Sequence, residues 1–294
     1  MARDGTVGDA ALLARLERYL DAVPRGGAIA EDFRSLTLFA RVGAGWPYYA
    51  RPTLGWPEPV TAADLQTVRE RQRELGLPEA FEWVEDTTPS LGPVAEAAGL
   101  VVERLPLMVL VRPTAATHLV AAPGLAAASG PVAAPPPAGV RLRIVGPDDP
   151  GLAAATTVAD VGFALPGTAP GPAGPSERDV AAAALTADRL DPARARMRRG
   201  LMVMVVGEDD DLGPLGVGWH QPLDGVTEIV GVATLPSARR RGLAAAVTAR
   251  LVADALGRGI STVFLTAGSD DVARVYARVG FERVGTSGIA APPP

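Results

Sequence analysis

A short strand that runs through a basic turn into a helix constrains this chain more than any other part of its sequence. Residues 229–235 are an apolar run rich in β-branched side chains, which predicts a buried strand. Pro236 ends that strand because proline has no N–H to donate to a neighbouring strand. Beyond the turn, apolar residues recur at the spacing of one helix face, at Leu243, Val247, Leu251 and Ala255.

This order of elements predicts an anion site at the turn. A strand, a tight turn and a helix direct unpaired backbone N–H groups and the positive end of the helix dipole toward one point. An anion fits there, most naturally a phosphate. Gly242 and Ala244 suit the site because a larger side chain at either position would keep a phosphate away from the main chain. The alternative is an arginine-rich solvated turn before an ordinary helix.

Two motifs resemble those of one family. The pattern Arg239-x-x-Gly242-x-Ala244 resembles the acyl-CoA pyrophosphate loop of the GNAT superfamily of N-acyltransferases, Gln/Arg-x-x-Gly-x-Gly/Ala after a strand. Residues 269–281, SDDVARVYARVGF, are similar to that family's helix Asn-x-x-Ala-x-x-Leu-Tyr-x-x-x-Gly-Phe. The resemblance covers residues from about 140 to 290, where the predicted order of strands and helices is also that of the family.

Composition narrows the class of protein. Of the 294 residues 48% are hydrophobic and 21% charged, so the chain can form a packed core of one large or two ordinary domains. No apolar run approaches the roughly 18 residues that span a bilayer, and the first residues, MARDGTVGDA, lack an apolar signal region. We therefore expect a soluble, cytoplasmic protein without a membrane partner.

Several chemistries are not expected. The chain has no cysteine, which excludes disulfides, thiolate metal sites and a cysteine nucleophile. Only His118 and His220 are available as imidazole ligands, so we expect no metal. A net charge of −5 and a pI near 5.2 argue against general nucleic-acid binding. The expected partner is a small-molecule or peptide amine; an oligomer is possible, and the sequence does not indicate its state.

The predicted fold is α+β or α/β, a GNAT-like mixed central sheet flanked by helices, in two similar domains. Residues 1–112 would form a degenerate GNAT-like domain, 113–139 an Ala/Pro/Gly-rich linker that contains His118, and 140–294 the catalytic GNAT domain. Residues 81–100 repeat the layout of 263–281, with Ala95 at the place of Tyr276. The helix after Thr61 has no Arg-x-x-Gly-x-Ala before it. An unrelated α+β domain is the alternative for the first half.

Periodicity and turn signals predict the individual elements. In the first half we expect helices at 8–22, 61–75 (with Thr61 as N-cap) and 89–98, and strands at 35–42, 46–51, 81–85 and 100–111. In the second half we expect helices at 148–164, 179–199, 243 onward and 270–279, strands at 140–144, 201–206, 215–220, 227–235, 262–266 and 281–290, and a flexible loop at 166–177.

The resemblance implies how a cosubstrate would be held. Backbone N–H groups from Arg240 to Ala245, including that of Leu243, would bind the diphosphate of acetyl-CoA or another acyl-CoA. Arginine side chains would add charge-assisted bonds. By resemblance, the preceding strand pairs its main chain with the pantetheine arm, and the Val232 N–H polarises the thioester carbonyl. The residues assigned to binding are therefore Val232, Ala233, Thr234, Arg239, Arg240, Arg241, Gly242, Leu243, Ala244, Ala245 and Ser269.

Direct acyl transfer to an amine also needs an acid and a base. Tyr276 is the candidate acid, because a phenol is protonated at neutral pH and can reprotonate a leaving thiolate; a tyrosine that merely packs the helix end is the alternative. Glu228 is the candidate base, or else a charged strand end facing solvent. Ser269 replaces the family's usual Asn, so a cofactor contact can be lost there. His220 is expected to be structural, with a place in the acceptor pocket as the alternative.

Together these features predict an N-acyltransferase, most naturally an N-acetyltransferase that moves an acetyl group from acetyl-CoA directly to an amine. A non-enzymatic module that binds CoA as a sensor is the alternative. A phosphate-binding module of another kind is a third reading. The acceptor stays open among amino acids, polyamines, antibiotics, peptide N-termini and protein lysines, because the predicted acceptor pocket involves variable helices and loops.

Overall fold

The computed structural model describes residues 6–43, 45, 47–111 and 134–294. The chain divides into two compact units. The first unit is Met1–Leu107 with Arg283–Pro294, and the second unit is Met108–Glu282. This division assigns the last residues to the first unit, whereas the predicted domains at 1–112 and 140–294 do not. Most of the predicted linker at 113–139, including His118, lies outside the described residues.

The second unit is built on a mixed sheet. Antiparallel strands join in the order β9-β8-β7-β6, and β10 pairs with β9 in parallel. Their bounds are β6 Val140–Val145, β7 Val203–Asp209, β8 Gly213–Leu223, β9 Val226–Thr234 and β10 Thr262–Thr266. The strands are apolar and largely β-branched, and side chains such as Val205, Val217 and Val263 are buried in one continuous core. The predicted strands are confirmed in place, with ends that differ by a few residues.

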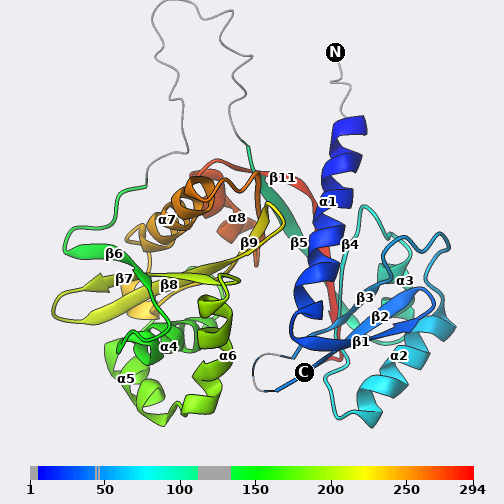
Figure 1. The fold of residues 1–294 in the computed structure, drawn as a ribbon, viewed down its shortest axis with the longest axis horizontal. Helices are drawn as coiled ribbons and strands as arrows, with labels where there is room; N and C mark the ends of the chain where they lie inside the picture. The colour runs from blue at the N-terminus through cyan, green and yellow to red at the C-terminus, as the bar shows by residue number, and fades with distance from the viewer. Residues whose placement is uncertain (1–5, 44, 46, 112–133) are drawn as a thin grey trace, which may run out of the picture. The chain divides into compact units, whose positions relative to one another are not determined.

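Helices cover both faces of that sheet, with α7 on one face and α4 to α6 on the other (Figure 1). Their bounds are α4 Leu152–Phe163, α5 Pro175–Ala184, α6 Ala187–Arg198, α7 Leu243–Gly257 and α8 Asp270–Ala277. The single helix predicted at 179–199 was wrong, because the backbone is extended at Leu185 and Thr186. A β-branched residue favours such a conformation just before a new helix.

The first unit contains hydrogen-bonded strands in the order β1-β2-β3-β4-β11. Its strands are β1 Ala28–Phe33, β2 Leu36–Arg41, β3 Ala50–Pro52, β4 Phe81–Val84 and β11 Phe281–Ala291, and β5 Val101–Leu110 runs from this unit into the other. Its helices are α1 Thr6–Arg25, α2 Ala62–Glu74 and α3 Leu91–Ala97. The prediction missed β1, whose Ala, Glu and Asp residues are weak strand formers.

Both units contain the same succession of a strand, a helix, a parallel strand and a second helix. In the second unit these are β9, α7, β10 and α8; in the first they are β3, α2, β4 and α3. Ala95 is fully buried in α3 among the core residues of the first unit. The two helices that follow the first strand of each set, α2 and α7, differ at their N-termini, as described below.

Candidate functional site

The strand β9 opens one edge to solvent partway along its length. Its pairing with β10 ends at Glu228 and Phe264, so the residues of β9 beyond Glu228 have no β10 partner. Pairing with β8 shifts register between Val217 and Trp219, and the extra residue lies on β9. Gly231 adopts a positive φ of 64° at this bulge. Gly231 was not among the predicted site residues, although an isolated glycine within a strand is a signal of a bulge.

The turn after β9 presents the N-terminus of α7. A 3-10 helix η2 (Pro236–Ala238) follows the strand, and then Arg240 and Gly242 take positive φ values of 64° and 87°. In the described chain no side chain caps α7, whose N-cap is Gly242. The first N–H groups of this 15-residue helix are therefore available to an anion. We call residues 236–245 the phosphate loop.

A cavity of about 940 Å³ runs beside β9 and the phosphate loop, within the second unit. Most of the predicted site residues line it: Glu228, Val232, Ala233, Thr234, Arg239, Arg240, Gly242, Leu243, Ala244, Ala245, Ser269 and Tyr276. Arg241 is exposed and is not among the lining residues. The structure thus brings α8 together with β9 and the phosphate loop, which precede it in the sequence.

Tyr276 lies at the inner side of α8. Its side chain is 7% exposed, and its ring packs edge-on against Phe281 with ring centroids 6.2 Å apart. Burial raises the pKa of the phenol well above its ordinary value. The hydroxyl of Tyr276 therefore stays protonated throughout the neutral range, as a general acid requires.

Glu228 and Ser269 flank the cavity at different places. Glu228 is partly buried at the point where β9 leaves β10. Ser269 is the N-cap of α8, and its hydroxyl oxygen accepts from the Val272 N–H at 3.2 Å. That hydrogen bond gives the serine a structural task at a position where the resemblance implied a cofactor contact. Its O–H can still donate to a ligand.

His220 lies outside the cavity lining and is fully buried between β8, β9 and α7. Its Nε2 is 3.0 Å from the Asp254 carboxylate and its Nδ1 is 3.0 Å from the Thr227 hydroxyl. Since a carboxylate only accepts, Nε2 carries the proton and Nδ1 accepts from Thr227. Burial lowers the pKa of His220 and outweighs the opposing effect of Asp254. The expectation of a structural histidine agrees with this geometry.

Part of the cavity wall comes from the end of α4 and the segment after it. Gly162, Phe163, Leu165, Pro166, Gly167 and Thr168 line it. The guanidinium of Arg239 donates to the carbonyls of Gly162, Leu165 and Ala169. The flexible loop predicted at 166–177 is thus hydrogen-bonded to the phosphate loop, and its last part already belongs to α5.

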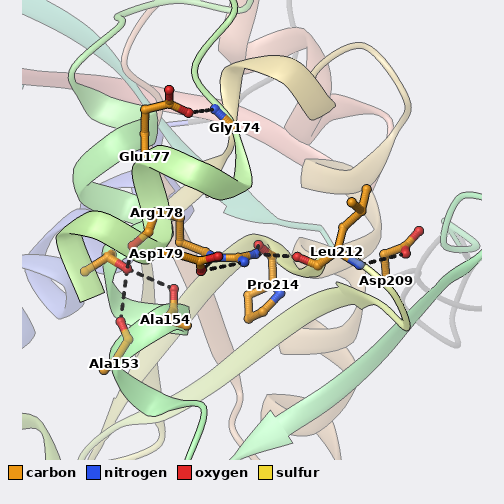
Figure 2. A network of polar contacts seen from close by, with 10 residues as sticks. Ala153, Ala154, Gly174, Glu177, Arg178, Asp179, Asp209, Leu212 and Pro214 are labelled. Atoms are coloured by element: carbon orange, nitrogen blue, oxygen red, sulfur yellow. Dashed lines mark hydrogen bonds and ion pairs between the residues drawn. The ribbon is translucent and has the colours of Figure 1, made fainter. Parts of the chain in front are cut away.

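A buried arginine fixes the start of α5, which follows this wall. Figure 2 shows Arg178 with its guanidinium directed at the turn between β7 and β8, where Nη1 donates to the carbonyls of Leu212 at 2.7 Å and Pro214 at 2.6 Å. The Glu177 carboxylate accepts from the Gly174 N–H at 2.7 Å. The Arg178 bonds hold α5 against the start of β8, and the Glu177 bond caps the N-terminus of α5 itself.

Comparison with known proteins identifies this part of the chain. Residues 176–281, which contain β9, the phosphate loop and α8, match the acetyltransferase (GNAT) family. The chain contains a GNAT domain. The motifs on which the resemblance was based both lie within the matched residues, and the predicted superfamily is confirmed.

Solved structures extend the GNAT likeness over most of the chain. A GCN5-related N-acetyltransferase from Kribbella flavida has 23% identity and a TM-score of 0.65, with 96% of each chain covered. A GCN5-related N-acetyltransferase-like protein from Streptococcus suis 89/1591 has 12% identity and a TM-score of 0.55, with 96% of this chain and 98% of that chain covered. A tandem GNAT protein from the clavulanic acid biosynthesis pathway has 16% identity and a TM-score of 0.50, covering 88% and 79%.

These likenesses establish the GNAT fold, and the predicted fold class is confirmed. No curated protein matches the sequence. Among the described residues no helix combines the length and the apolarity needed to cross a membrane. Nor does that part of the chain contain a group of three or more His, Asp or Glu side chains suited to a metal ion.

The first unit differs from the GNAT domain at the corresponding helix N-terminus. Helix α2, which follows β3 as α7 follows β9, is capped by Thr61 and Asp64 in a reciprocal capping box. The Asp64 carboxylate accepts from the Thr61 N–H at 3.2 Å and from the Ser35 hydroxyl at 2.8 Å. Hydrogen bonds from Thr61 and Ser35 lower the pKa of Asp64 although its burial alone would raise it. A carboxylate of the chain thus occupies the N-terminus of α2, whereas the N-terminus of α7 has no side-chain cap.

Proposed function

We propose that the protein is an N-acetyltransferase that moves an acetyl group from acetyl-CoA directly to an amine. The observation that carries this proposal is the path along β9. The strand offers an unpaired main-chain edge beyond Glu228 and then leads to the uncapped N-terminus of α7. A pantetheine arm fits along the unpaired edge of β9 as an added strand, and a diphosphate fits at the N-terminus of α7. The cavity has room for the acyl group and for part of an acceptor.

The main chain would hold the cosubstrate and polarise its thioester. N–H groups from Arg240 to Ala245 would donate to the diphosphate, and the bulge at Gly231 would turn the Val232 N–H toward the thioester carbonyl. In the proposed reaction the amine nitrogen forms a bond to the carbonyl carbon, and negative charge develops on the oxygen that Val232 stabilises. The C–S bond then breaks, and CoA leaves as a thiolate.

Two side chains would move the protons. Glu228 lies at the end of the unpaired part of β9, where it would take a proton from the attacking ammonium, directly or through water. Tyr276 would give its phenolic proton to the departing thiolate. Its raised pKa keeps the phenol protonated at neutral pH, so the proton is present when the thiolate forms beside it. The amine acceptor is a small molecule or a peptide.

The first experiment is thermal melting with acetyl-CoA, CoA and ATP, followed by a screen of amines with detection of free thiol. The chain suits this assay because it contains no cysteine to react with the thiol reagent and no lysine to be acetylated. We expect acetyl-CoA to raise the melting temperature and at least one amine to release CoA. Stabilisation by acetyl-CoA without turnover across the panel would favour a regulatory module. Stabilisation by ATP alone would refute the acyl-CoA site.

A further inference from the structure

The guanidinium of Arg239 makes its hydrogen bonds with backbone carbonyls of another segment. Nη2 donates to Gly162 at 2.6 Å and to Leu165 at 2.7 Å, and Nη1 donates to Ala169 at 2.9 Å. Its two neighbours behave differently. Arg240 and Arg241 are exposed and make no hydrogen bond or ion pair within the described part of the chain. The first arginine of the motif is therefore occupied, and the next two are free to meet a ligand.

The carbonyls that Arg239 contacts include those at the C-terminus of α4. Gly162 lies in the last turn of α4, and Leu165 lies just beyond it. The last carbonyls of a helix have no partner within the helix, and they form the negative end of its dipole. A planar guanidinium is well suited to serve several of these carbonyls at once, because its donors are fixed in a fork. Arg239 thus caps α4 from a different part of the chain.

Main-chain bonds and close packing join the same two segments. The Gly171 N–H donates to the Pro236 carbonyl at 3.2 Å, and the Ser237 N–H donates to the Ala173 carbonyl at 3.0 Å. A Cβ added to Gly174 would lie 2.7 Å from the Ser237 hydroxyl oxygen, which leaves no room for a side chain. We call residues 162–169 the wall segment, since most of them line the cavity.

We propose that Arg239 is a positioning residue that holds the wall segment against the phosphate loop, and that it is not a ligand of the cosubstrate's phosphates. The wall segment then covers the arm of the cosubstrate that lies along β9, while Arg240 and Arg241 supply the positive charge for the phosphates. This inference rests on the proposed function only where it names an acyl-CoA. The hydrogen bonds between Arg239 and the three carbonyls, which we call the clamp, do not depend on catalysis.

Hydrogen exchange of the ligand-free protein tests the clamp directly. In Arg239→Met we expect amide exchange at Ala164, Gly171 and Ser237 to become at least about tenfold faster, because the variant loses three charge-assisted bonds. Arg240→Met is the matched control, since it removes an arginine from the same loop without a bond to the wall segment. Arg239→Lys keeps the charge and is used if the Met variant does not fold. Equal exchange in the Arg239 and Arg240 variants would overturn the proposal.

Two acyl donors test the role toward the ligand. S-acetylpantetheine lacks the phosphates and the nucleotide of acetyl-CoA. We expect Arg239→Met to lower kcat/KM by about tenfold or more with both donors, and Arg240→Met to lower it with acetyl-CoA alone. A loss in Arg239→Met confined to acetyl-CoA would make the side chain a phosphate ligand and overturn the proposal. If no donor supports turnover, the proposed function fails, whereas the exchange experiment still decides the clamp.

Discussion

Gly231 and Trp219 face each other across β8 and β9 with no space between them. A Cβ added to Gly231 would lie 2.2 Å from Cη2 of Trp219. The glycine also has a left-handed backbone, with a φ of 64°. The bulge that turns the next residues of β9 toward the cavity therefore depends on the absence of a side chain at this position.

We predict that Gly231→Ala destabilises the protein by about 2–4 kcal/mol, from backbone strain and from the clash with Trp219. The measurement is urea unfolding of the variant and the wild type. Gly257→Ala is the control, because Gly257 lies in α7 with nothing within 4 Å of an added Cβ. That change is expected to be neutral or slightly stabilising. An equally stable Gly231→Ala would show that the bulge tolerates a side chain.

Tyr276→Phe tests the proposed acid. The ring stays in place against Phe281, so the fold and the dissociation constant for acetyl-CoA should be unchanged. The value of kcat should fall by about 100-fold or more, because the thiolate loses its proton donor. Steady-state kinetics and calorimetry check the two expectations. Wild-type kcat in the variant would leave Tyr276 with a packing role only.

Glu228→Gln tests the proposed base through the pH dependence of the rate. The amide keeps the shape of the side chain and cannot accept a proton. We expect kcat/KM of the variant to be lower near neutral pH and to recover toward high pH, where free amine becomes abundant. A pH profile with the wild-type shape and height would exclude the carboxylate from the reaction.

The difference between α7 and α2 predicts one acetyl-CoA per chain. The uncapped N-terminus of α7 is available, whereas Asp64 already caps α2. Replacing Arg240 and Arg241 by Glu should weaken binding at least about tenfold, since two charge-assisted contacts become repulsive. Calorimetry measures both quantities. The pair Arg189→Glu with Arg199→Glu changes the net charge equally at exposed sites and serves as the control. A stoichiometry of two would show that the first unit also binds.

His220 predicts a loss of stability on acidification. Burial lowers its pKa in the folded protein, so below about pH 6.5 the unfolded chain binds more protons than the folded one. Stability is therefore complete above that pH and declines as the pH falls. Melting temperatures between pH 7.5 and 5.5 should decrease, and His220→Gln should flatten the curve while Gln can still bond to Thr227 or Asp254. An unchanged slope in the variant would assign the pH dependence to other groups.

Much of this fold is predicted by patterns that involve only residues close together in the sequence. Thr61 was predicted as an N-cap and is one, since the capping box needs only three further residues. The phosphate loop was found for the same reason, because a strand, a turn and a helix follow one another directly. The family match and the solved structures then confirm the fold that these signals indicated.

Such short-range patterns could not predict contacts between segments that are distant in the sequence. Nothing near Arg239 in the sequence indicates that its guanidinium donates hydrogen bonds to carbonyls more than 70 positions earlier. The loop before α5 contains many Gly and Pro residues and was predicted to be flexible, but these residues allow close packing against η2. The catalytic roles of Tyr276 and Glu228 stay predictions, because burial and position define where a group lies and only kinetics defines what it does.

The capping of α2 by Asp64 has a consequence for how the chain responds to its cosubstrate. The first unit supplies its own negative charge at that helix, so we expect it to gain nothing from acetyl-CoA, whereas the proposed site would stabilise the second unit when its helix binds a diphosphate. Falling supply of the metabolite would thus loosen one half of the polypeptide and leave the other as it was. Limited proteolysis at rising acetyl-CoA should protect sites in 134–282 selectively.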